Sequence, residues 1–238
     1  MSRTSAIEWT QSTWNPWHGC VKVSPGCKNC YMYRDKERYG QNPKLITRSK
    51  TTFRDPLTWE EPKLIFTCSW SDWFIGNADE WREEAWDIIR RTPQHTYQVL
   101  TKRPERILNH LPHDWGTGWK NVWLGVSIET QEYVWRKEIL QSVPAHVRFI
   151  SAEPLLGPIN LAPLTNIHWV ITGGESGPNA RPMNLEWSRT IRDQCLREHV
   201  AFFHKQNGGK ARVEGTWGGR LLDGRTWDGM PQLAHQYL

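Results

Sequence analysis

The sequence predicts an α/β fold in which parallel strands, in a sheet or a barrel, are covered by helices. Two observations lead to this prediction. Six short apolar runs rich in β-branched and aromatic residues are spread along the chain, and amphipathic helical stretches lie between several of them. The chain has 238 residues, 38% of them hydrophobic, and no linker or low-complexity segment interrupts the alternation. We therefore expect a single domain over residues 1–238.

Each apolar run ends in small or polar residues, as a buried strand followed by a loop does. The runs occupy residues 64–73, 96–104, 121–130, 147–158, 168–177 and 200–209. Helices are expected at 78–91, 132–142 and 184–199, where apolar residues recur at helical spacing. In the first of these, acidic residues come early and arginines late, as the helix dipole prefers. Asp223 and Gly224 predict the turn of a C-terminal β-hairpin within residues 215–238.

Composition sets limits on location and partners. The first ten residues lack the apolar core of a signal peptide, and no run of eighteen apolar residues occurs, so we expect a cytoplasmic protein without a membrane span. The net charge is +5, and residues 22–54 hold nine basic residues but only two acidic ones. This basic stretch is interpreted either as an ordinary solvated surface or as a surface that follows nucleic-acid phosphates.

The ends of the six predicted strands carry the polar residues from which a site is expected. Ligands of α/β sheets and barrels bind at the carboxyl ends of strands, so these residues would surround one pocket. Taken singly, each serine or glutamate is also explained as a helix cap, whereas the gathered set of glutamates and cations favours a ligand. The set is Ser69, Ser71, Asp72, Thr101, Lys102, Arg103, Ser127, Glu129, Thr130, Ser151, Glu153, Gly173, Gly174, Glu175, Ser176, Lys205 and Gln206.

Three of the five cysteines, Cys20, Cys27 and Cys30, lie in one short segment, residues 18–31, which we name the cysteine loop. Cytosolic thiols stay reduced, so such a cluster favours metal or redox chemistry over disulfides. One hypothesis is a zinc ion held by the three cysteines and His18. The other is a three-thiolate 4Fe-4S cluster with one open iron, which can chelate the amino and carboxylate groups of S-adenosylmethionine.

Motifs spread over nearly the whole chain resemble a phage-associated family of unknown function, whose genomic neighbours include three-Cys-motif partner proteins. They are IEWTQSTWNPWHGCVKVSPGCKNCY, LTKRP, GVSIET, SAEPLLGPI, GGESGPNARPM and LLDGRTWDGMPQ. That family is similar to radical S-adenosylmethionine enzymes, distantly including spore photoproduct lyase. The C-x6-C-x2-C spacing departs from the common C-x3-C-x2-C, and the aromatic Tyr31 follows the last cysteine instead of preceding it.

The resemblance implies a partial (β/α) TIM-like barrel of the radical S-adenosylmethionine type, with a first strand near residues 7–10. It implies that Cys20, Cys27 and Cys30 bind a 4Fe-4S cluster. The residues implied to bind S-adenosylmethionine are Ser69, Ser71, Ser127, Glu129, Glu153, Gly173 and Gly174. Glu175, Lys102 and Cys68 are the candidate catalytic residues. Cys68 is interpreted either as a hydrogen-atom donor or as a small buried apolar residue. Lys102, Arg103, Arg181 and Lys205 remain for an anionic substrate.

We therefore expect an enzyme that cleaves S-adenosylmethionine to a 5'-deoxyadenosyl radical, which takes hydrogen from a substrate. A nucleotide or nucleic acid is the candidate substrate, and an external electron donor and a three-Cys-motif partner protein are the candidate partners. Two alternatives stay open. One is a metal-stapled nucleic-acid-binding module without catalysis, and the other is a barrel hydrolase that uses Glu129, Glu153 and Glu175 as acid and base.

Overall fold

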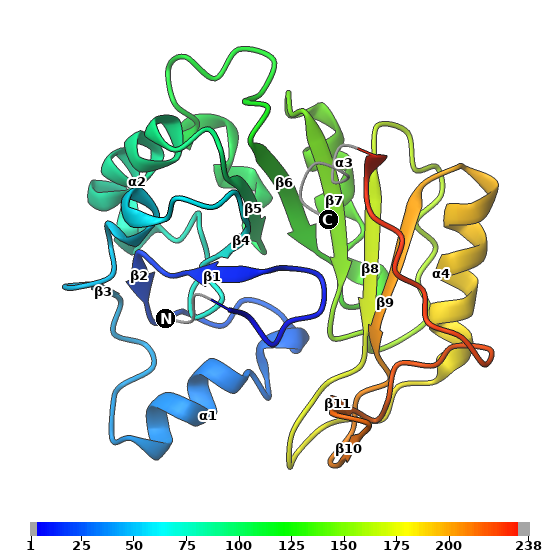
Figure 1. Cartoon of the computed structure of the whole chain (residues 1–238). Helices are drawn as coiled ribbons and strands as arrows, with labels where there is room; N and C mark the ends of the chain where they lie inside the picture. The colour runs from blue at the N-terminus through cyan, green and yellow to red at the C-terminus, as the bar shows by residue number, and fades with distance from the viewer. Residues whose placement is uncertain (1–3, 233–238) are drawn as a thin grey trace.

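A computed structural model describes residues 4–232 and shows a parallel sheet of seven strands that curls into half of a barrel (Figure 1). The order of strands in the sheet follows their order in the chain. They are β1 (Ser12–Trp14), β4 (Leu64–Thr67), β5 (Thr96–Thr101), β6 (Val122–Ser127), β7 (Val147–Ala152), β8 (Trp169–Gly173) and β9 (Ala201–Gln206). The prediction of an α/β fold with a partial barrel is confirmed. All six apolar runs contain one of these strands.

Three helices lie outside the curled sheet, within the three stretches that the periodicity predicts: α2 (Asp79–Arg91), α3 (Trp135–Ser142) and α4 (Leu185–Arg197). A fourth, α1 (Tyr31–Arg38), follows the cysteine loop directly. The shorter elements are β2 (Trp17–His18), β3 (Thr47–Arg48), β10 (Arg212–Val213), β11 (Thr216–Trp217), η1 (Pro25–Cys27), η2 (Asp55–Thr58), η3 (Gly76–Ala78), η4 (Pro104–Arg106), η5 (Leu108–His110) and η6 (Gln131–Tyr133). None of the helices in residues 4–232 combines the length and apolar character that crossing a membrane requires.

The strands separate two apolar cores because successive side chains point to opposite faces of a sheet. The outward side chains, such as Val99, Leu124 and Val170, pack in the larger core with residues of the helices. The inward side chains fill the half-barrel and are mostly aromatic: Phe66, Trp123, Phe149, Trp169 and Phe203. Both faces are therefore covered, which explains why the strands appear in the sequence as continuous apolar runs instead of an alternating pattern.

The N-terminal segment differs from the prediction of a strand near residues 7–10. The first strand is β1, which begins at Ser12, and the residues before it enter the half-barrel. Trp9 packs there between opposite walls, with ring centroids 4.7 Å from Phe66 and 6.1 Å from Trp169. Burial of this indole inside the half-barrel outweighs strand pairing, and residues 7–9 close the filled interior from the open side.

The C-terminal region also differs in detail. Asp223 and Gly224 have positive φ angles of 58° and 75°, as a tight turn requires, but the pairing around them is a single bridge between Leu222 and Arg225. The chain then runs along the edge of β9, where Phe203 pairs with Asp228. Residues 233–238 of the predicted hairpin lie outside the described residues.

A substitution at Gly125, in the middle of β6, can test how tightly side chains fill the half-barrel. A Cβ atom at this position would overlap the buried ring of Phe149 on β7. Gly125→Ala should therefore lower the free energy of unfolding by about 1–3 kcal/mol, because the ring must leave its packed position. Gly157→Ala is the matched control, since no heavy atom lies within 4 Å of the added methyl group. Equal denaturant midpoints for the two variants would contradict this account of the core.

Candidate functional site

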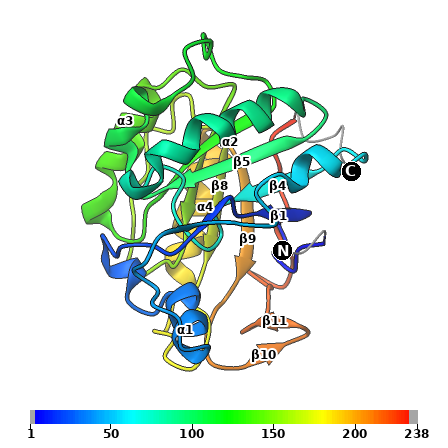
Figure 2. The same ribbon diagram turned by 90° about the vertical axis from the view of Figure 1, so that its left-hand side faces the viewer.

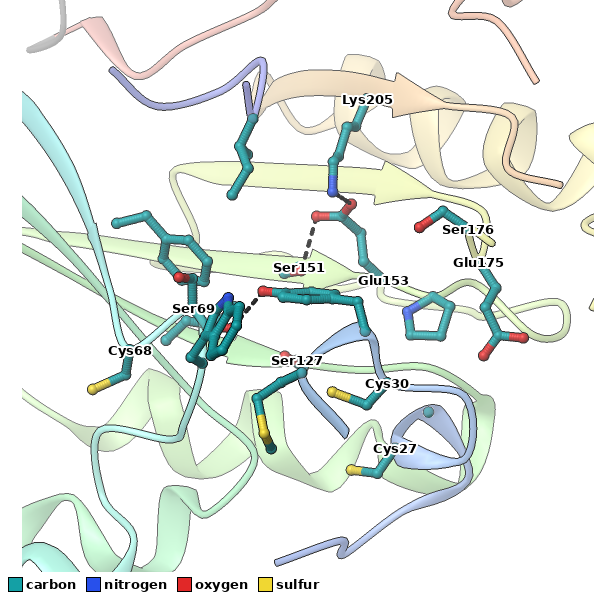
Figure 3. Close-up of a pocket in the computed structure, with 18 of the residues that line it drawn as sticks. Cys27, Cys30, Cys68, Ser69, Ser127, Ser151, Glu153, Glu175, Ser176 and Lys205 are labelled. Carbon is teal, nitrogen blue, oxygen red and sulfur yellow. Dashed lines mark hydrogen bonds and ion pairs between the residues drawn. The ribbon is translucent and has the colours of Figure 1, made fainter. Parts of the chain in front are cut away.

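A pocket of about 600 Å³ opens at the carboxyl edge of the half-barrel (Figure 3). The ends of six strands reach it, as expected from the sequence. From the predicted set, its walls include Ser69, Ser71, Asp72, Thr101, Lys102, Arg103, Ser127, Ser151, Glu153, Gly174, Glu175, Ser176, Lys205 and Gln206. Glu129, Thr130 and Gly173 do not line it. Two perpendicular views show that α1 and the β10–β11 hairpin lie at the same end of the molecule (Figures 1 and 2).

All three cysteines of the cysteine loop line this pocket, and all are free thiols. The Cys27 and Cys30 side chains lie side by side and point the same way (Figure 3). Burial raises the pKa of Cys20 to about 12, and the neighbouring Asp72 carboxylate adds to this. Burial also raises the pKa of Cys30, although the backbone amides of Met32 and Tyr33, in the first turn of α1, donate to its sulfur and oppose the shift. Metal ligation must therefore displace thiol protons.

The three thiols and His18 do not converge as the ligands of a single zinc ion do. Within residues 4–232, no group of three or more His, Cys, Asp or Glu side chains is arranged to hold one metal ion. His18, the nitrogen donor of the zinc hypothesis, packs edge-on against Trp70 at 6.1 Å and does not line the pocket. A 4Fe-4S cluster places each thiolate on a different iron, so its ligands stand around a volume and do not converge on a point. Three thiols along one pocket wall suit that arrangement.

Glu129 lies under the cysteine loop and is fully buried, so the prediction that its carboxylate faces the pocket is wrong. It forms ion pairs of 3.0 Å with both Lys102 and Arg136, and it accepts a hydrogen bond of 2.5 Å from the Ser24 hydroxyl. Gly26 of the loop lies so close that a Cβ atom there would overlap the Glu129 side chain. Burial alone would raise the Glu129 pKa, but the two cations more than offset it, and the pKa is lowered.

A second carboxylate holds the other end of the cysteine loop. Glu175, at the end of β8, accepts hydrogen bonds from Asn29 at 2.8 Å and from the Arg181 guanidinium at 2.5 and 2.9 Å. Arg181 also donates to the Pro25 carbonyl at 3.1 Å. The structure thus engages Arg181, which the sequence left for an anionic substrate, in holding the loop. Glu175, a candidate catalytic residue, reaches the pocket wall with its carboxylate already bound.

Glu153 and Lys205 face each other within the pocket, with 3.0 Å between Glu153 Oε1 and Lys205 Nζ, and the Ser151 hydroxyl donates to Glu153 at 3.2 Å (Figure 3). The resemblance implies that Gly173 and Gly174 bind the cofactor, but protein atoms fill the free side of each glycine. A Cβ atom on Gly173 would lie 2.7 Å from Glu153 Oε1, and one on Gly174 would overlap the Asn207 carbonyl. Both glycines therefore permit packing within the protein.

The wall that follows β4 brings Cys68, Ser69 and Ser71 to the pocket. Ser71 donates to the Gly19 carbonyl at 2.6 Å, and Ser69 exchanges hydrogen bonds with Asn15. Cys68 is 3% exposed and has a left-handed φ of 54°. Burial raises its pKa well above the ordinary thiol value. Both interpretations of Cys68 are compatible with this position.

Three cations of the basic stretch at residues 22–54 are paired or buried. Arg48 and Arg54 both pair with Glu84 on α2, at 2.5 and 2.9 Å, and Lys36 is buried in α1. Burial removes Lys36 from a phosphate-following surface, whereas Arg48 and Arg54 remain partly exposed beside Glu84.

A family model with the description "Protein of unknown function (DUF5131)" matches residues 4–231. The chain belongs to the DUF5131 family. Comparisons with curated proteins and with solved structures found no match.

In this DUF5131 chain, the pocket also contains residues that the sequence analysis missed. Glu8 and Trp9 line it from the N-terminal segment, and Arg212 and Trp217 line it from the β10–β11 hairpin. The turn Glu214–Gly215, with φ of 48° and 84°, joins two strands of two residues each. A Glu-Gly pair between β-branched residues was the available signal for this hairpin.

Loss of the Glu129 carboxylate should destabilise the protein. Glu129→Ala leaves the buried Arg136 without its counter-ion, so the free energy of unfolding should fall by about 3–5 kcal/mol, measured by urea denaturation. Glu132→Ala is the control, because it removes an exposed carboxylate next to α3, the helix that carries Arg136. It should have little effect on the free energy of unfolding. If both variants unfold at the same urea concentration, the ion pairs at Glu129 do not stabilise the fold.

The lowered pKa of Glu129 also predicts a pH dependence. A carboxyl whose folded pKa lies below its unfolded value contributes stability above that unfolded value, 4.5, and loses the contribution as the pH falls through the folded pKa. Stability should therefore decline below pH 4.5. The decline should be smaller in Glu129→Gln, measured as the urea midpoint across acidic buffers.

Proposed function

We propose that this protein is a 4Fe-4S cluster-binding enzyme of the radical S-adenosylmethionine type. The observation that carries the proposal is the placement of three free thiols, from one loop, on the wall of a pocket at the carboxyl edge of a parallel half-barrel. Active sites of (β/α) barrels lie at this edge. The resemblance of the sequence motifs to a family similar to radical S-adenosylmethionine enzymes supports the same proposal.

In this proposal Cys20, Cys27 and Cys30 hold the cluster, and the pocket beyond them accepts S-adenosylmethionine. When bound, the reduced cluster would supply the electron that cleaves the cofactor to methionine and a 5'-deoxyadenosyl radical. Of the residues implied to bind the cofactor, Ser69, Ser71, Ser127 and Glu153 line the pocket and can donate to or accept from it. An external electron donor, a cytoplasmic location and a three-Cys-motif partner protein belong to the proposal as well.

The residues around the thiols serve the proposed chemistry by fixing the loop. Glu129 and Glu175 bind it from two strand ends, and the hydroxyl of Ser24, which donates to Glu129, lies 3.7 Å from the Cys27 sulfur. Arg103 pairs with Asp72 at 2.9 Å and donates to the Val21 carbonyl at 2.8 Å. The loop therefore contacts the ends of β5, β6 and β8.

The hydrolase alternative loses its acid–base pair in this geometry. Glu129 is buried among cations, and Glu175 is held by Arg181 and Asn29, so neither is free to exchange protons with a water molecule. Glu153 is the remaining carboxylate of that set, and it pairs with Lys205. Two separated carboxylates with opposite roles, which glycosidase-type hydrolysis needs, are not present among these three.

The ligand assignment is tested by removing one thiol at a time. Cys20→Ala, Cys27→Ala and Cys30→Ala should each lose the iron content and the visible absorption of the cluster after anaerobic reconstitution, because three thiolates are the minimum that holds it. Cys68→Ala and Cys195→Ala are the controls and should load iron fully. A full cluster in any one of the first three variants would show that the assignment is wrong.

The enzyme claim is tested on the loaded wild-type protein. Reduced with dithionite in the presence of S-adenosylmethionine, it should release methionine and 5'-deoxyadenosine, detected by mass spectrometry, and the three cysteine variants should release neither. A loaded, reduced protein that leaves S-adenosylmethionine intact would reject the radical mechanism and favour the metal-stapled binding module.

A further inference from the structure

The charged side chains of the pocket are almost completely paired. Asp72 pairs with Arg103, Glu153 with Lys205, and Asp35 with Arg34, and all six residues line the pocket. Lys102 and Glu175 are bound by Glu129 and Arg181. Within residues 4–232, the charged pocket residues left without an ion-pair partner are Glu8 and Arg212. One unmatched negative charge and one unmatched positive charge therefore remain for a ligand.

Glu8 lies beside the aromatic filling of the half-barrel. Its Oε2 atom is buried and has no hydrogen-bond partner, and the same holds for Nε1 of the neighbouring Trp9. Trp9 is 3% exposed. A buried acceptor and a buried donor without partners are costly, and a ligand that supplies N–H groups to Glu8 and a carbonyl oxygen to Trp9 removes that cost. This end of the pocket thus suits a polar edge on a flat, otherwise apolar group.

Arg212 lies on the β10–β11 hairpin, directly across from Trp217. Its guanidinium carbon is 5.1 Å from the Trp217 ring centroid, so the cation and the indole are presented together. The hairpin is fixed to the end of β9, because the Gly208 amide donates to the Trp217 carbonyl at 2.8 Å and the Asn207 side chain donates to the Gly218 carbonyl at 3.0 Å. Trp217 is half-buried, and an arginine beside an aromatic ring is a common combination for phosphate and nucleobase binding.

We propose that the pocket binds a nucleoside phosphate with its base directed to Glu8 and Trp9 and its phosphate to Arg212, with Trp217 available for stacking. Guanine is the base that fits best. Its edge places two N–H donors side by side, which one carboxylate binds with both oxygens, next to a carbonyl that can accept from an indole N–H. The inference rests on the proposed function for treating this nucleotide as the substrate, whereas binding itself needs no cluster.

Binding is measured by titration calorimetry on the full chain without cluster or S-adenosylmethionine, with GMP, guanosine and ribose 5-phosphate as probes. GMP should bind more tightly than either fragment. Glu8→Gln should weaken GMP and guanosine at least about tenfold and leave ribose 5-phosphate unchanged, since the amide presents a donor where the base also donates. Glu61→Gln, at an exposed position outside the pocket, is the matched control.

Arg212→Ala should weaken the binding of GMP about tenfold and leave the binding of guanosine unchanged, because Arg212 contacts only the phosphate, which guanosine lacks. Lys210→Ala, an exposed cation beside the hairpin that does not line the pocket, should leave GMP binding as it is. A single-stranded oligothymidylate with one central dG separates a free nucleotide from a nucleotide within a strand. If this oligomer binds more tightly than GMP and with a steep salt dependence, the natural ligand is a guanine nucleotide within a nucleic-acid strand. If it binds more weakly, the natural ligand is a free nucleotide.

The proposal is overturned if GMP binds no more tightly than ribose 5-phosphate. It is also overturned if Glu8→Gln weakens S-adenosylmethionine and not GMP, which would place Glu8 in the cofactor site. These outcomes are separable from failure of the proposed function. If the protein binds GMP but loads no iron, the nucleotide site is supported and the proposed function is rejected. If the protein cleaves S-adenosylmethionine but does not bind GMP, the nucleotide site is rejected and the proposed function is supported.

Discussion

The Glu129 carboxylate joins three parts of the molecule that are distant in sequence: the end of β5 through Lys102, helix α3 through Arg136, and the cysteine loop through Ser24 and the close approach of Gly26. A fully buried carboxylate is costly unless cations and donors satisfy it, so all these contacts have to be present together. The position of the cysteine loop is therefore coupled to the packing of α3 on the sheet. The pocket wall that carries the thiols thus depends on contacts within the barrel.

The aromatic filling of the half-barrel determines where the pocket can be. Trp123, Phe149 and Trp169 occupy the interior from the amino ends of the strands, and Trp9 adds to them from the open side. These rings pack against one another below the pocket. The inward positions beyond them are polar: Lys102, Ser127, Ser151 and Lys205. The change from apolar to polar inward residues along each strand thus separates the part of the barrel that stabilises the fold from the part that meets a ligand.

The strands and the three outer helices were predictable because burial on both faces leaves long apolar runs and amphipathic stretches that survive without any tertiary information. The gathering of strand ends into one pocket followed from the parallel arrangement. The side on which Glu129 lies could not be predicted, because a carboxylate after an apolar strand looks the same whether it meets a ligand or a loop. The information that decides the side is the burial of Arg136, seven residues later, and its ion pair with Glu129. The β10–β11 hairpin was also missed, since its two-residue strands give too short an alternating pattern and only the Glu-Gly pair of its turn marks it in the sequence.

The long spacing between Cys20 and Cys27 has a structural counterpart in the turn η1, Pro25–Cys27, and the residue before it. These positions carry Ser24 and Gly26, the two points at which the loop meets Glu129. A loop with three residues between the first two cysteines would have no room for both contacts, and the carboxylate would face an empty space. The length of the cysteine loop and Glu129, two residues after β6, are therefore structurally coupled. A related protein that shortens the loop should also be found to have replaced the glutamate.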